Sequence, residues 1–130
     1  MGYGYETTIS GAKLSDAVAA VTEALKAEGF GVLTEIDVEA TLKKKIDVDF
    51  RPYVILGACN PRLAHQALEL DDQMGLLLPC NVVVQEVPDG AKVSIVDPHA
   101  MFQVVHDDRV QPIASEAAER LQRVMAALRG

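Results

Sequence analysis

Two cysteines are the residues of this chain best suited to chemistry. Cys59 is followed by Asn60-Pro61, a pair typical of a helix start, because Asn caps the first turn and Pro lacks the N–H that would need a partner there. A helix N-terminus favours a thiolate, so we expect the pKa of Cys59 to be lowered. Cys80 begins another predicted strand. If the two strands run antiparallel as neighbours, the two sulfurs lie close together despite their separation in sequence.

This pair of cysteines has several interpretations. It predicts a dithiol, a thiol that carries sulfur, or a soft-metal site in which two thiolates hold Cu(I). The alternative is that both are small buried side chains, because free cysteine is among the most buried residue types. Neither C-x-x-C spacing nor a nearby basic cluster is present, so the sequence favours packing over chemistry.

Other catalytic and metal-binding patterns are missing from the sequence. No His-x-x-His or Glu-x-x-His pair is present, so we expect no metal site. The acidic pairs Asp71-Asp72 and Asp107-Asp108 adjoin predicted helix ends, where capping and solvation explain them. Gly29-Phe30-Gly31 lies between a helix and a strand, whereas a dinucleotide-binding loop follows a strand. We therefore expect no cofactor, and an enzyme is the less favoured class.

The elements that must position the cysteines alternate between strand and helix periodicity. Alternating or β-branched runs predict strands at residues 3–10, 32–36, 51–59, 79–87 and 91–97. Apolar stripes at helical spacing predict four helices whose inner faces are Leu14, Val18, Val21 and Leu25; Val38, Leu42 and Ile46; Leu63, Ala64, Ala67 and Leu68; and Ile113, Ala117, Leu121, Val124, Met125 and Leu128. Residues 98–106 are either a loop with one helical turn or another short strand. The pattern predicts a single α+β domain over residues 1–130.

Composition and charge exclude several classes of protein. The chain has 130 residues, which is one domain. Twelve Lys and Arg against nineteen Asp and Glu give a net charge of −7, and there is no Trp, which disfavours a nucleic-acid partner. No targeting segment is visible, and the apolar runs are far shorter than the ~20 residues of a membrane span. With only two cysteines, we expect a soluble cytoplasmic protein without a membrane partner.

Four blocks of the sequence carry a further indication: residues 29–38, 41–45, 55–61 and 75–84. Together they resemble the family catalogued as domain of unknown function 302, over nearly the whole chain. The resemblance implies a TATA-box-binding-protein-like α+β fold, a curved antiparallel sheet with helices packed on one side (β-α-β4-α with extra short helices). Related domains sometimes occur beside disulfide-reductase or rhodanese-type sulfur-handling modules. Because Cys59 and Cys80 both lie in matching blocks, the resemblance also favours a thiol role for them.

The function that these points favour is a non-catalytic module that binds an unknown small molecule or a protein. A sheet with one covered face leaves a concave surface or a cleft for a ligand or a second copy, and its edge strands invite a homodimer. The candidate ligand-binding residues are Cys59, Asn60, Cys80 and Asn81. The alternative is a redox or sulfur-transfer module in which Cys59 is the nucleophile and Cys80 the resolving thiol. Binding of Cu(I) by both sulfurs is a weaker alternative.

Overall fold

Alternating side chains make one face of the sheet apolar. Val82 and Val84 in β4 and Val93 and Ile95 in β5 are fully buried, whereas the residues between them are partly or fully exposed. The computed structural model describes residues 2–129. Its five strands form one antiparallel sheet in the order β1-β5-β4-β3-β2. Their bounds are β1 Gly4–Ser10, β2 Gly31–Asp37, β3 Tyr53–Cys59, β4 Cys80–Val87 and β5 Gly90–Val96.

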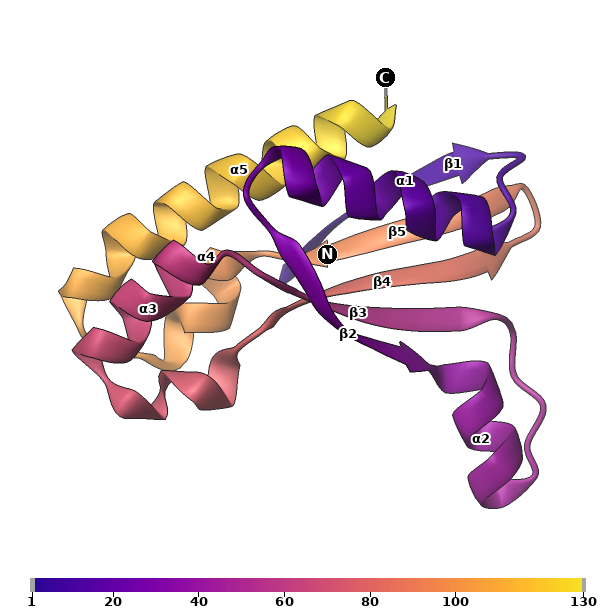
Figure 1. The fold of residues 1–130 in the computed structure, drawn as a ribbon, viewed down its shortest axis with the longest axis horizontal. Coiled ribbons are helices and arrows are strands. Elements are labelled where there is room, and N and C mark those ends of the chain that lie inside the picture. Colours follow the sequence, from indigo (N-terminus) through magenta and orange to yellow (C-terminus); the bar gives the residue numbers. More distant parts are fainter. Residues whose placement is uncertain (1, 130) are drawn as a thin grey trace.

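Two long helices, α1 (Leu14–Ala27) and α5 (Gln111–Arg129), cover that face (Figure 1). Gly29 has a φ of +82° and ends the turn after α1, in the left-handed conformation that glycine adopts without strain. The helices and strands share one core, which includes Ala17, Val21, Leu25, Leu56, Val82, Val93, Leu121, Val124 and Met125. The predicted α+β class, with helices on one side of an antiparallel sheet, is confirmed. The uncovered side is called the open face below.

A second apolar cluster lies beyond the sheet. It is built from α3 (Pro61–Leu70), α4 (Pro98–Met101) and the first half of α5, with 3₁₀ turns η1 (Asp72–Leu77), η2 (Phe102–Val104) and η3 (Asp108–Val110). The segment of residues 98–106, for which the sequence allowed either a loop with one helical turn or a short strand, begins with a short helix followed by a 3₁₀ turn. The Asp97 carboxylate accepts the His99 N–H and starts α4. The cluster consists of Leu63, Ala67, Met74, Phe102, Val110, Ile113, Ala114 and Ala117.

The remaining helix, α2 (Val38–Ile46), stands apart from the others beyond the ends of β2 and β3 (Figure 1). Asp37 caps it, since its carboxylate accepts the Ala40 N–H at 2.9 Å. The predicted inner face of Val38, Leu42 and Ile46 is wrong, because no residue of α2 is buried and Ile46 is 62% exposed. α1 and α5 pack on the sheet and on each other, so neither covers α2.

Leu68 on α3 is a smaller error of the same kind. It was expected to face inward, but it is exposed, because only Leu63 and Ala67 of this helix are buried in the second cluster. Among residues 2–129, no helix is long and apolar enough to cross a membrane.

Candidate functional site

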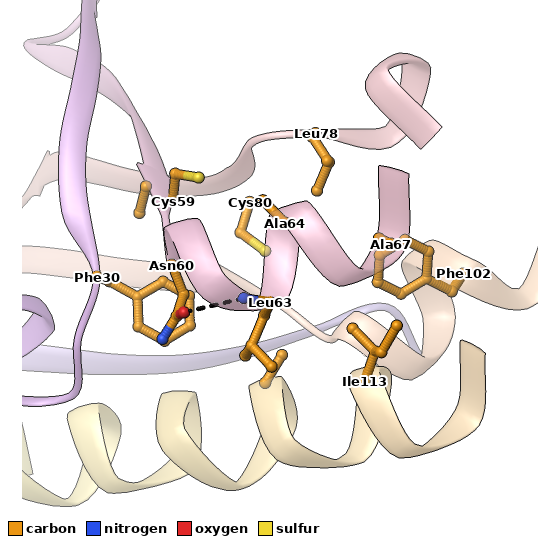
Figure 2. A pocket seen from close by; sticks show the side chains of 12 residues that line it. Phe30, Cys59, Asn60, Leu63, Ala64, Ala67, Leu78, Cys80, Phe102 and Ile113 are labelled. Atoms are coloured by element: carbon orange, nitrogen blue, oxygen red, sulfur yellow. Dashed lines mark hydrogen bonds between the residues drawn. The ribbon is translucent and has the colours of Figure 1, made fainter. Parts of the chain in front are cut away.

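An apolar cavity lies between the two clusters, where β3 ends and β4 begins. α3 and α5 form two of its walls (Figure 2). Its empty volume is about 340 Å³, part of which opens to solvent. The lining consists of Phe30, Ala58, Cys59, Asn60, Leu63, Ala64, Ala67, Leu78, Cys80, Phe102, Ile113 and Ala117. Such a lining favours an apolar occupant, because few polar groups are available to pair with a polar one.

Asn60 joins β3 to α3 at the edge of this cavity. Its Oδ1 accepts the Leu63 N–H at 3.2 Å, and its backbone oxygen accepts the Ala64 N–H at 2.9 Å. Asn60 is only 8% exposed, and its Nδ2 makes no hydrogen bond to the residues that the structure describes. A Cβ at Gly29 would lie 3.0 Å from this Nδ2, so glycine leaves room for the amide. Asn60 is thus a helix cap whose Nδ2 group remains free to donate.

The two cysteines border the same cavity. Cys59 is the last residue of β3 and partly exposed, whereas Cys80 is the first residue of β4 and 6% exposed. β3 and β4 are antiparallel neighbours, as the sequence analysis supposed, and Cys80 pairs in register with Ala58. Both thiols are unpaired. Both free thiols therefore border one cavity, Cys59 partly exposed and Cys80 buried, but they are not register partners on the two strands.

Burial raises the pKa of both thiols. The pKa of Cys59 is raised by desolvation alone, and the pKa of Cys80 is raised to about 11, first by desolvation and then by the charge of a Cys59 thiolate. The expectation that a helix terminus lowers the pKa of Cys59 is therefore wrong in sign. Burial disfavours the charged thiolate, and this desolvation is the cause of the raised pKa of Cys59.

A charged network holds the helices around the cavity in place. The Glu116 carboxylate on α5 accepts hydrogen bonds from Arg62 on α3 at 2.7 Å and from Arg120 at 3.0 Å. Arg120 also donates to the backbone oxygen of Glu28 at the end of α1, at 3.1 Å. Both guanidinium groups are thus engaged with oxygen atoms, and neither lowers the pKa of Cys59.

Asn81 does not belong to the cavity. Neighbouring residues of a strand point to opposite faces, so Asn81 is exposed on the open face while Cys80 is buried. It borders a shallow apolar hollow there, together with Tyr3, Gly4, Val83 and Val96. The structure therefore brings together three of the four candidate ligand-binding residues, Cys59, Asn60 and Cys80, and separates the fourth.

Comparison with known proteins identifies the family. The model of the domain of unknown function DUF302 matches residues 5–128. This chain belongs to the DUF302 family. It is similar to the crystal structure of an uncharacterized conserved DUF302 protein from Bacillus stearothermophilus, with 29% identity and a TM-score of 0.89, over 98% of this chain and 99% of that one. No curated protein matches the chain. The predicted family resemblance is thereby confirmed.

Several residues that form the cavity of this DUF302 chain were missed in the sequence. Phe102 comes from the segment whose structure the sequence left open, and Phe30 and Leu78 were assigned to no site. The Asp97-Pro98 pair, a cap followed by proline, was the available indication that a helix begins there. Among residues 2–129, no three His, Cys, Asp or Glu side chains are placed to hold a metal ion.

Proposed function

We propose that this DUF302 chain is a non-catalytic binding module whose cavity takes a small apolar ligand or the apolar end of a larger one. The observation that carries the proposal is the lining of the cavity. Phe30, Leu63, Leu78, Phe102 and Ile113 converge there from five separate segments of the chain. Among the lining residues, those with polar side chains are Cys59, Cys80 and Asn60.

The size of the cavity limits its occupant. The cavity's empty volume of about 340 Å³ includes the open mouth, so the enclosed part is smaller. An apolar cavity is a poor site for water, which finds no hydrogen-bond partners there, and it accepts xenon or small hydrocarbons. A methyl group, a short alkyl chain or one edge of a ring fits better than a whole cofactor, and the Asn60 Nδ2 can donate to an acceptor atom at the cavity mouth.

Thiol-based redox or sulfur transfer is the second candidate, favoured by the position of both free thiols at one cavity. Nucleophilic attack requires the thiolate, and burial works against it at both positions by raising each pKa. Binding therefore accounts for the site better than catalysis does. The same two sulfurs are the only sulfur ligands that the cavity walls offer a Cu(I) ion, a third candidate with less support.

Xenon is a suitable probe for the binding proposal because it needs only space and an apolar wall. We expect methyl resonances of Leu63, Leu78 and Ile113 to shift saturably as xenon pressure rises. Ala64→Leu, which adds volume at the cavity wall, should abolish the shift. Ala127→Leu makes the same change on an exposed turn of α5 and should leave it intact. Shifts that stay linear with pressure, or that survive in Ala64→Leu, contradict the proposal.

Alkylation by iodoacetamide at pH 7 separates the two main candidates. A binding module with both pKa values raised should react slowly at Cys59, and at Cys80 only through unfolding. Labelling of Cys59 in the native protein faster than that of a small free thiol at the same pH would favour thiol chemistry instead.

A further inference from the structure

A small niche in front of Gly29 is bordered by two nitrogen atoms from other parts of the chain. The position that a Cβ would take at Gly29 lies 3.0 Å from the Asn60 Nδ2 and 3.7 Å from the Arg120 Nη1. Apart from the chain neighbours of Gly29, no other heavy atom of residues 2–129 lies within 4 Å of this position. Both atoms that reach the niche from elsewhere in the fold are therefore hydrogen-bond donors.

Each of these two nitrogens has N–H groups without an acceptor among residues 2–129. Asn60 is only 8% exposed and caps α3 with its Oδ1, while its Nδ2 makes no hydrogen bond to the described chain. The Arg120 Nη1 carries two N–H groups and donates one hydrogen bond, to the Glu28 backbone oxygen at 3.1 Å. Polar side-chain atoms in so buried a residue usually have a partner. An acceptor from outside the chain would therefore complete the niche.

The niche and the apolar cavity share one wall. Asn60 lines the cavity, Phe30 is the residue after Gly29, and Ala117 is one turn before Arg120 on α5. Figure 2 shows the amide nitrogen of Asn60 on the side of its amide group that faces α5. One molecule can therefore place an apolar end among the side chains of the cavity and an acceptor atom in the niche.

The charge around the niche favours an anionic acceptor. Two guanidinium groups, those of Arg62 and Arg120, share the single carboxylate of Glu116. The charged side chains within four residues of Gly29, Asn60 and Arg120 along the chain are Lys26, Arg62, Arg120 and Arg123 against Glu28, Glu116 and Glu119. Four positive and three negative groups leave +1 here, although the whole chain carries −7. An anion meets attraction at this place and repulsion over most of the remaining molecule.

We infer that the cavity and the niche together bind a short-chain monocarboxylate. Its alkyl chain fills the cavity, and its carboxylate accepts hydrogen bonds from the Asn60 Nδ2 and from the second N–H of the Arg120 Nη1. This inference rests on the proposed binding function and adds the chemical class of the ligand. A carboxylate is held more tightly than a neutral group of the same shape, because hydrogen bonds between ionised partners are the stronger ones.

An NMR titration of the wild-type chain at pH 7 tests the inference. The probes are the straight-chain monocarboxylates from acetate to hexanoate, and the primary amide of each serves as a neutral probe of the same shape. Affinity for the carboxylates should rise roughly fourfold with each methylene group until the cavity is full. Each amide should bind at least roughly tenfold more weakly than its carboxylate. The side-chain NH2 resonances of Asn60 should shift with the head group, and the methyl resonances of Leu63 and Ile113 with the alkyl chain.

Two variants test the head-group contacts separately. Arg120→Gln removes the guanidinium charge and should reduce the preference for carboxylate over amide to less than roughly threefold. Arg129→Gln is the matched control, because it makes the same change on an exposed residue at the end of α5 and should retain the preference. Asn60→Asp keeps the capping oxygen and replaces the Nδ2 donor by a second oxygen. It should abolish carboxylate binding, since it puts like charges together.

Xenon separates this inference from the function on which it rests. A wild-type chain that takes up xenon but binds carboxylates no more tightly than amides overturns the inference and leaves the proposed function standing. A carboxylate preference that Arg120→Gln leaves intact also overturns it. Failure of xenon and of every probe to bind overturns the proposed function as well. Should either variant fail to fold, the comparison of carboxylates with amides on the wild-type chain still decides.

Discussion

α2 and α3 start in the same way and end in opposite environments. Each follows a strand directly, each is capped by a side chain that accepts the N–H three residues on, and each carries an apolar stripe. Leu63 and Ala67 of α3 are buried in the second cluster, whereas no residue of α2 is buried. α3 packs on α5, more than forty residues later in the chain, and no helix crosses α2.

The local sequence of a helix does not determine whether its apolar face is buried. Capping and periodicity decide where a helix begins and which face is apolar, because both act over a few residues. Whether that face is covered depends on chain segments far away in the sequence. α3 therefore contributes to the stability of the folded chain, whereas the apolar stripe of α2 stays partly or fully exposed.

The largest expected difference between the two regions is in core stability. Leu63→Ala should lower the free energy of unfolding by about 3 kcal/mol, since it removes a buried side chain beside an existing cavity. Leu42→Ala makes the same deletion on α2 and should cost less than about 1 kcal/mol in dilute protein. Denaturant unfolding of both variants measures the difference. Equal losses would mean that α2 is as much a part of the core as α3.

Sequence reasoning recovered the elements of this fold because their boundaries are local. The caps at Asp37 and Asn60, the left-handed glycine at Gly29 and the hairpin near Gly90 each depend on a few neighbouring residues. The predicted burial of Ile46 failed because periodicity identifies an apolar face without identifying what covers it. The secondary structure of residues 98–106 could not be predicted, because a four-residue helix and a 3₁₀ turn are too short to show a hydrophobic period.

The candidate site was recovered in part for a similar reason. That Cys59 ends one strand and Cys80 begins the next could be predicted, and the antiparallel pairing brought them to one cavity. The alternation of side chains could also have excluded Asn81, which follows Cys80 within a strand. The sign of the pKa shift at Cys59 could not be foreseen. It depends on burial by segments that are distant in the sequence.

The stability of the chain at alkaline pH depends on how well the Cys80 thiol is shielded from water. Burial raises the pKa of Cys80 from its ordinary value of 9.0 to about 11 in the folded chain, so the thiol of the unfolded chain loses its proton first. The contribution of the Cys80 thiol to the free energy of unfolding is therefore fully present below pH 9. It is lost, by roughly 2 to 3 kcal/mol, as pH rises through 11. Unfolding of the wild type and of Cys80→Ala at several pH values isolates this contribution. Parallel pH profiles would show that water reaches the Cys80 sulfur.

The smallest difference concerns the two helix caps. Asn60→Ala should lower the free energy of global unfolding by about 1 kcal/mol, because α3 is part of the cooperative core. Asp37→Ala removes the equivalent bond from α2 and should speed amide exchange in that helix while leaving global unfolding nearly unchanged. Asn60→Asp retains a capping oxygen and serves as the control for side-chain shape. A global loss from Asp37→Ala as large as that from Asn60→Ala would mean that α2 unfolds together with the sheet. The contrast between the two helices would then lie only in their exposure, since both would belong to one cooperative unit.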